Sequence, residues 1–183
     1  MLNPGSTLQR ILFTPVDAAS VAVFRIGFGV VMLIDAIGHL FFVSLDAMFI
    51  EPPFMFRYFG YEWVPLLREG VYVVYGIIAV ASLGIIVGRF YHLSAAIVTL
   101  GTAWVFLQDQ AQYLNHMYLL ILYSALMTFI PAHRYWSLAA RRDPAFRSET
   151  LPAWCRLALI LQIEIILIYA GLVKLNPDWL AFE

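Results

Sequence analysis

Charged side chains are scarce in this sequence: only 13% of its 183 residues are Asp, Glu, Lys or Arg, whereas 62% are hydrophobic. The eleven basic and twelve acidic residues give a net charge of −1, which leaves no dense basic surface for nucleic acid. Cysteine is almost absent too, and a lone Cys155 excludes an intrachain disulfide framework and a zinc knuckle. A soluble domain normally carries about twice as much charge, so we expect lipid to be the main surroundings of this chain.

Long stretches without any charged residue also indicate a membrane protein. Three of them cover residues 70–88, 90–108 and 110–133 and are 19, 19 and 24 residues long. About 20 apolar residues are enough to cross a bilayer as a helix. Each stretch therefore predicts one membrane span.

Two further apolar segments carry a few polar groups. The first contains Arg25, Asp35 and His39, and the last contains Gln162 and Glu164. We still interpret both as membrane helices, in which buried charge must be paired or hydrated. The predicted fold is an all-α integral membrane helical bundle of about five transmembrane helices in a single membrane domain, residues 1–183. The predicted spans are 18–43, 70–88, 92–108, 113–132 and 156–174.

The distribution of basic residues predicts the orientation of a multi-pass protein. Seven of the eleven basic residues fall in connections on one face: Arg10, Arg89, Arg134, Arg141, Arg142, Arg147 and Arg156. Basic loops stay in the cytoplasm. We therefore expect a cytoplasmic N-terminus, and we expect the loop 44–69, the turn 108–112 and the segment 174–183 to meet on the exterior or lumenal side.

The first of these outer segments is rich in aromatic residues, with seven of them among residues 49–63, interrupted by Pro52 and Pro53. Aromatic side chains commonly form a belt at the lipid interface. The alternative is a lid over a flat, apolar ligand.

Lys174 is the only lysine in the chain and lies at the predicted end of the last helix. A lysine withdrawn from water can lose its proton and act as a general base, whereas arginine stays charged. The alternative is a lysine that extends to the lipid headgroups. The sequence Asn176-Pro177-Asp178 predicts the start of another helix. Because the sequence stops at Glu183, we expect the chain to be truncated at its C-terminus.

Other polar residues of the predicted spans have two interpretations each. His116 starts the fourth span on the outer side, as a structural group or as a hydrogen-bonding partner of a substrate oxygen. Asp35 and His39 are four residues apart and share a helix face, for interhelical packing or for a proton path. Glu164 is expected to contact another helix.

Several kinds of site have no sequence signal. There is no pair of histidines with metal-binding spacing, no glycine-rich phosphate loop and no serine in a nucleophile elbow. The four histidines include no expected facing pair, with His92 and His133 on the cytoplasmic side. We therefore predict no metal cofactor.

Four motifs together resemble a known family. They are VFLQDQ at residues 105–110, YLNH at 113–116, AHRYWS at 132–137 and GLVKLNPDW at 171–179. Residues 12–17 and 88–94 add similarity, so the match covers nearly the whole chain. The motifs resemble the N-terminal membrane domain of vitamin K-dependent gamma-carboxylases, the horizontally transferred transmembrane domain.

The resemblance implies a lyase-type enzyme that uses reduced vitamin K or a related quinol, oxygen and carbon dioxide to carboxylate glutamate in a peptide or protein. By motif position, Lys174 would be the initiating base, and His116 with Asn115 would hold the quinol. The remaining residues expected to bind quinol or substrate are Tyr113, Asp109 and Trp179. The family commonly has two adjacent lysines, whereas this chain has Val173 and then Lys174. The alternatives are a non-enzymatic membrane module that binds lipid or protein, and another quinol oxidoreductase.

Overall fold

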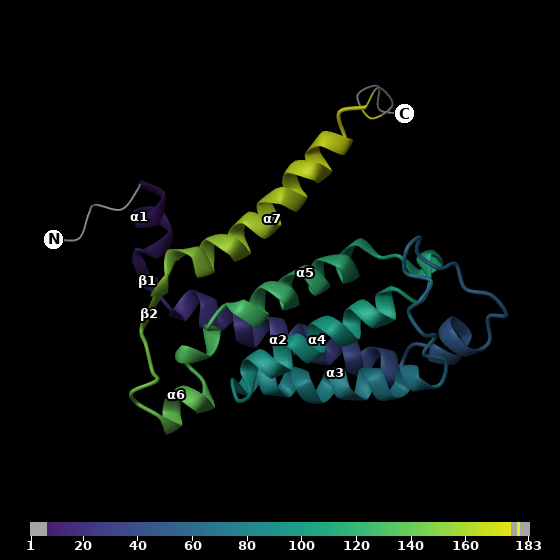
Figure 1. Cartoon of the computed structure of the whole chain (residues 1–183), viewed down its shortest axis with the longest axis horizontal. Helices are drawn as coiled ribbons and strands as arrows, with labels where there is room; N and C mark the ends of the chain where they lie inside the picture. Colours follow the sequence, from purple (N-terminus) through teal and green to yellow (C-terminus); the bar gives the residue numbers. More distant parts are fainter. Residues whose placement is uncertain (1–6, 177–178, 180–183) are drawn as a thin grey trace.

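A computed structural model of the protein describes residues 7–176 and residue 179, and these residues are mainly helical (Figure 1). The α-helices are α1 (Thr7–Phe13), α2 (Ala19–Phe41), α3 (Gly70–Val87), α4 (Tyr91–Phe106), α5 (Asn115–Phe129), α6 (Leu138–Arg142) and α7 (Ala153–Val173). The shorter elements are β1 (Pro15–Asp17), a π-helical turn η1 (Asp46–Ile50), two 3-10 turns η2 (Gln110–Gln112) and η3 (Ala132–Arg134), and β2 (Thr150–Pro152). All five predicted spans are therefore helices.

Helices α2 to α5 form the bundle. Helix α3 packs against both α2 and α4, and α5 packs against α4. Apolar side chains from all four helices fill the space between them, and Met32, Ile78, Val98 and Met127 are almost completely buried. Helix α7 differs, because Figure 1 shows it leaving the bundle at an angle.

The helix lengths decide how many spans the structure supports. Among the described residues, α2, α3 and α7 are long and apolar enough to cross a membrane. Helix α4 is shorter at 16 residues, and α5 qualifies only with the segment Ala132–Arg142, from which it is bent by 60°. Pro131 explains the early end of α5, since proline cannot continue a helix. The structure thus supports three or four spans, and the count of five stays a prediction.

A small two-stranded sheet joins the beginnings of α2 and α7. Strands β1 and β2 are antiparallel, with Val16 opposite Leu151. The N–H groups of Ala18 and Ala153 extend the contact by donating to Glu149 and Thr14 across the junction, each at 2.9 Å. We call this sheet the clasp. It fixes the base of α7 against the base of α2.

Arg25 is completely buried near the same end of α2. Its guanidinium donates to the carbonyl oxygens of Ile85, of Ile86 at 2.6 Å and of Trp136 at 2.7 Å. These carbonyls belong to the end of α3 and to the segment before α6. Arg25 therefore connects three parts of the chain, namely α2, the end of α3 and the segment before α6.

Gly88 ends α3 beside this guanidinium, with a left-handed φ of 70°. A Cβ atom at Gly88 would collide with Cβ of Ser137 and lie 3.1 Å from Nη1 of Arg25. We expect Gly88→Ala to lower the free energy of unfolding by about 2 kcal/mol or more, because the left-handed conformation and the collision both oppose alanine. Thermal unfolding in detergent measures the effect.

Gly76→Ala is the matched control for this prediction. Gly76 lies inside α3, and a Cβ there would meet nothing within 4 Å. Alanine favours a helix over glycine by up to about 1 kcal/mol, so Gly76→Ala should be neutral or stabilising. Equal effects of the two substitutions would contradict the role given to Gly88.

Candidate functional site

Most of the predicted site residues lie at one end of the bundle, which we call the loop end. It is the end where α2 and α4 finish and α3 and α5 begin, and it carries the long connection 42–69 (Figure 1). We call the opposite end, with the connection from α5 to α7, the arginine end.

Six of the seven aromatic residues among positions 49–63 divide into two groups. Phe49 is buried, at 3% exposure, whereas the other group faces outward, up to 94% at Phe59. The outward group is Phe54, Phe56, Phe59, Tyr61 and Trp63. Outward aromatic rings at a helix-bundle end are typical of a lipid-interface belt, so the structure favours the belt over a lid for these five.

Tyr58 departs from that pattern because it turns inward. Its ring stacks on Phe106 with centroids 5.4 Å apart, and Phe106 also contacts Tyr113 at 5.5 Å and Tyr118 at 6.1 Å. We call these four residues the aromatic cluster. They present rings from α4, α5 and two connections close to the start of α5, where a flat aromatic ligand could stack.

The hydroxyl of Tyr58 is buried and has no hydrogen-bond partner in the described part of the chain. Burial, and then the nearby Tyr113 and Asp109, raise the pKa of Tyr58. The hydroxyl therefore keeps its proton at neutral pH and can donate it to a ligand oxygen.

Asp109 and its neighbour Gln108 hold the connection in place. The carboxylate of Asp109 accepts from the N–H of Phe56 at 3.1 Å and of Ala111 at 3.0 Å. The Gln108 side chain, 0% exposed, accepts from the N–H of Leu67 at 2.7 Å. The geometry thus gives Asp109 a structural task, and its expected part in binding substrate stays a prediction.

Asn115 and His116 begin α5 and are both exposed. Their side chains are therefore accessible at the loop end, and the ligand contacts that the resemblance implies for them stay a prediction.

Lys174 caps the end of α7 and is exposed. Its Nζ lies 5.2 Å from the centre of the Trp179 ring, a cation–π contact. Asn176 accepts from the N–H of Trp179 at 2.8 Å, as expected of a residue that starts a new helix. Pro177 and Asp178, the rest of that expected start, lie outside the described residues.

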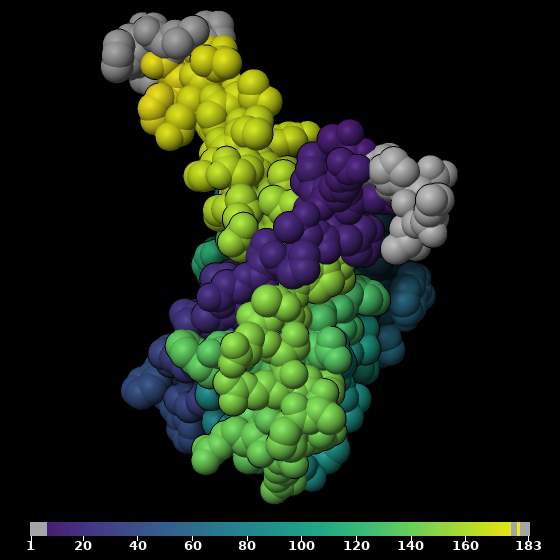
Figure 2. Space-filling model, turned by 90° about the vertical axis from the view of Figure 1, so that its left-hand side faces the viewer, coloured from purple at the N-terminus to yellow at the C-terminus, as the bar shows by residue number. Residues whose placement is uncertain are grey.

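The structure does not bring Lys174 to His116. Figure 1 shows the end of α7 apart from the start of α5, and in Figure 2 the second half of α7 projects from the molecule. Only the first half of α7 meets the bundle, where the Tyr123 hydroxyl donates to the Leu159 carbonyl at 3.3 Å. Lys174 and Trp179 therefore form one part of the candidate site, and the residues of α5 form another.

Residues 13–183 match the HTTM domain, the domain found in vitamin K-dependent gamma-carboxylase and related proteins. This chain belongs to the HTTM family. The matched range includes both parts of the candidate site. No solved structure matches the chain.

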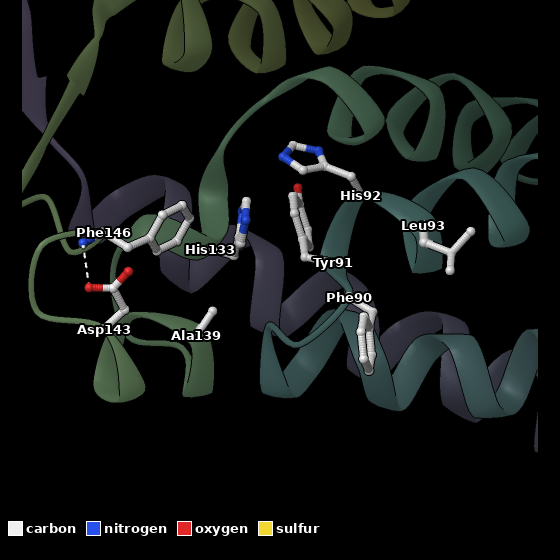
Figure 3. Close-up of a pocket in the computed structure, with 8 residues that line it drawn as sticks. All are labelled: Phe90, Tyr91, His92, Leu93, His133, Ala139, Asp143 and Phe146. Carbon is white, nitrogen blue, oxygen red and sulfur yellow. Dashed lines mark hydrogen bonds between the residues drawn. The ribbon is translucent and has the colours of Figure 1, made fainter.

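The arginine end of this HTTM domain holds a separate cavity of about 390 Å³ (Figure 3). Two histidines line it, and the rings of His92 and His133 lie 4.6 Å apart, edge to face. The expectation that no two histidines face each other is therefore wrong. The cause is the fold: the start of α4 and η3 meet at the arginine end although they are distant in sequence.

The histidine pair does not extend to a metal site. Burial, and then His92, Arg25 and Arg134, lower the pKa of His133 to about 4, so its ring is uncharged at neutral pH. In the part of the chain that the structure describes, no three His, Cys, Asp or Glu residues are arranged to hold a metal ion. Tyr91 stacks on His133 at 4.9 Å, and Phe146 lies on the other side of His133 in Figure 3. The rings of Tyr91, His92, His133 and Phe146 therefore form a packed aromatic group.

Proposed function

We propose that this HTTM domain is the membrane part of a gamma-glutamyl carboxylase-like enzyme, which couples oxidation of a quinol by oxygen to carboxylation of glutamate. The observation that carries the proposal is the family match over residues 13–183, which includes Lys174 and the 113–116 motif. When bound, a reduced naphthoquinone would supply, with oxygen, the strong base that removes the glutamate γ proton before carbon dioxide adds.

The loop end has features that suit such a ligand. The aromatic cluster offers ring faces for stacking, and the unpartnered hydroxyl of Tyr58 could donate to a quinol oxygen. Asn115 and His116 are exposed beside this cluster and would hydrogen-bond the other polar groups of the ligand. Tyr113 belongs to the cluster itself.

Lys174 would take up the proton that starts the reaction. The ammonium group is exposed and rests on Trp179 in this structure, so the role requires the second half of α7 to approach α5. A general base must be able to carry an uncharged amine, which lysine can provide and arginine cannot.

A direct assay tests the proposal. The protein is reconstituted in vesicles with reduced vitamin K, labelled carbon dioxide and a glutamate-containing peptide. We expect quinone epoxide and labelled carboxyglutamate. Quinol oxidation without fixation of carbon dioxide would instead indicate another quinol oxidoreductase. If neither product forms, the enzyme proposal is refuted.

A non-enzymatic membrane module is the second candidate. The observation that favours it is the exposed pair of Lys174 and Trp179 at a helix end, an arrangement that also suits a lipid-interface anchor. This second candidate predicts that Lys174→Arg leaves the binding of lipid or protein unchanged.

We also propose that the arginine end faces the cytoplasm and that the loop end faces the exterior or lumen. Cysteines placed at Glu62 and Ala145, both exposed, report on the two ends in a Cys155→Ser background. Because basic connections stay in the cytoplasm, an impermeant thiol reagent added outside intact cells should label only position 62. Both positions should react after permeabilisation. Labelling at position 145 alone would invert the orientation.

A further inference from the structure

A groove of about 510 Å³ runs along the surface of the bundle between α3 and α4, which lie side by side (Figure 1). On α3 its lining residues recur at helical spacing, which places them on one face of the helix. They are Val73, Gly76, Ile77, Val80 and Gly84. On α4 the lining residues include Leu93 and Ile97, one turn apart. We call this the α3–α4 groove.

Two glycines of α3 give the groove its shape. A Cβ atom at Gly84 would collide with Ser94 of α4, so the two helices approach each other closely there. A Cβ atom at Gly76 would meet nothing within 4 Å, so the groove is open at that position. Val73 and Val80 beside it are 64% and 71% exposed. In a membrane, an exposed apolar surface of this kind meets acyl chains instead of water.

The length of the groove matches one leaflet of a bilayer. From Val73 to Gly84, the part of α3 that lines the groove measures about 16 Å at 1.5 Å per residue. The hydrocarbon layer of one leaflet is about 15 Å, half of the bilayer core. A single acyl chain that enters at the arginine end therefore fits the length of the groove.

Arg89 lines the groove at the arginine end and is exposed. Its guanidinium lies 4.6 Å from the centre of the Phe90 ring, which lines the groove too, so this contact keeps the positive charge at the groove. Among the described residues Arg89 has no ion-pair partner. The guanidinium is therefore free to bind the phosphate of a ligand through charge-assisted hydrogen bonds.

Helix α4 begins directly after Arg89 and Phe90, and no side chain caps its first turn. The free N–H groups and the helix dipole at such an end favour an anion. Ser94 lies further into the same helix, about 5 Å from its start at 1.5 Å per residue. Its side chain lines the groove and is 7% exposed, and in the described part of the chain its hydroxyl has no hydrogen-bond partner. The hydroxyl can donate to an ester carbonyl, which in a phospholipid lies on the chain side of the phosphate.

We propose that the α3–α4 groove binds one anionic phospholipid, with an acyl chain between α3 and α4 and the phosphate at Arg89 and the start of α4. No acidic residue is among the described residues that line the groove. The cation of a zwitterionic headgroup would thus find no partner there, whereas an uncharged glycerol headgroup needs none. The proposal does not depend on the proposed function, because none of these residues belongs to the candidate site.

Native mass spectrometry of the purified protein tests the site with phosphatidylglycerol and phosphatidylcholine that carry the same acyl chains. We expect the wild-type protein to bind phosphatidylglycerol about tenfold more tightly. Arg89→Gln should remove most of this preference, and Arg89→Lys should keep part of it because the charge remains. Equal affinities of the wild-type protein for the two lipids, or an unchanged preference in Arg89→Gln, would overturn the proposal.

Two exposed charges outside the groove are the controls for Arg89. Arg141 lies on α6 at the arginine end, and Glu164 lies on α7. Among the described residues Glu164 has no ion-pair partner, so the expected contact between Glu164 and another helix is not seen. An effect of net charge alone would lower the preference in Arg141→Gln and raise it in Glu164→Gln. A site at Arg89 predicts that both variants keep the preference of the wild-type protein.

Gly76→Phe tests the place of the acyl chain, because the ring would fill the groove without meeting a neighbouring atom at Cβ. We expect this variant to bind both lipids more weakly. Gly27→Phe is the matched control: Gly27 is exposed on α2, and a Cβ atom there also meets nothing within 4 Å. Equal effects of the two substitutions would contradict the site. A change in the oligomeric state of Gly76→Phe, without a change in lipid binding, would show that a second copy of the chain occupies the groove.

Two measurements on the wild-type protein need no variant to fold. Glycerol phosphate, which has no acyl chains, should not displace phosphatidylglycerol, and displacement would indicate an anion site that does not use the groove. Phosphatidylglycerol with a photoreactive group in its acyl chain should crosslink to residues 73–84 of α3 and 93–97 of α4. Crosslinks that avoid both segments would refute the proposal.

Discussion

Replacing Lys174 by alanine is expected to abolish formation of quinone epoxide and of labelled carboxyglutamate. Lys174 is the only lysine of the chain, and by motif position it would be the initiating base. Loss of a general base slows a reaction by about 10²- to 10⁴-fold, which would bring either product close to background. Initial rates in vesicles, with protein amounts matched by quantitative blotting, measure the effect.

Lys174→Arg separates the two interpretations of this residue. Arginine keeps the positive charge and the cation–π contact with Trp179, but it does not give up its proton at any pH the enzyme meets. The enzyme proposal predicts that Lys174→Arg is as inactive as Lys174→Ala. Full activity of Lys174→Arg would show that the residue serves as an anchor and that it is not the general base.

Replacing Arg25 by methionine is expected to cause the largest loss of stability of any single substitution considered. Methionine has a similar length and is compatible with a helix, but it donates nothing. The carbonyls of Ile85, Ile86 and Trp136 would lose their charged donor, the guanidinium of Arg25, which is itself 0% exposed. The expected loss is about 3 kcal/mol or more in the free energy of unfolding. Thermal unfolding in detergent and the monodisperse fraction in size-exclusion chromatography measure it.

Arg89→Met is the control for this change. Arg89 is exposed in the connection between α3 and α4, where its guanidinium lies 4.6 Å from the centre of the Phe90 ring. An exposed contact of this kind contributes about 0.5–1 kcal/mol. Arg25→Lys should fall between the two, because an ammonium group cannot reproduce the planar fork. Equal stabilities of the Arg25→Met and Arg89→Met variants would show that the three carbonyl contacts contribute little.

The helices could be predicted because the absence of charge is a local property. The uncharged run 70–88 became α3 at Gly70–Val87, and the predicted span 18–43 became α2 at Ala19–Phe41. The end of α5 at Phe129 was missed by three residues, although Pro131 was a visible signal for it. The clasp had no such signal, since each strand has three residues and includes a proline.

The site could be predicted only in part, for a related reason. Helical spacing placed Asp35 and His39 on one face, and their side chains are paired in the structure. The contact between His92 and His133 depends on how the start of α4 packs against η3, which the spacing of residues within one helix does not determine. Similarly, the stacking of Tyr58 on Phe106 depends on the path of the connection 42–69, which the hydrogen bonds of Gln108 and Asp109 fix.

The clasp also bears on the order in which the protein assembles. Its two strands come from residues 15–17 and 150–152, so this contact closes a loop that contains the whole of α2 to α5. Contacts between segments so far apart in sequence form late, because the chain must first lose the entropy of closing the loop. Helices α2 to α5, whose packed neighbours mostly follow one another in the chain, can associate soon after they enter the membrane. Helix α7 would then dock last, and the clasp would form only after the four earlier helices have associated.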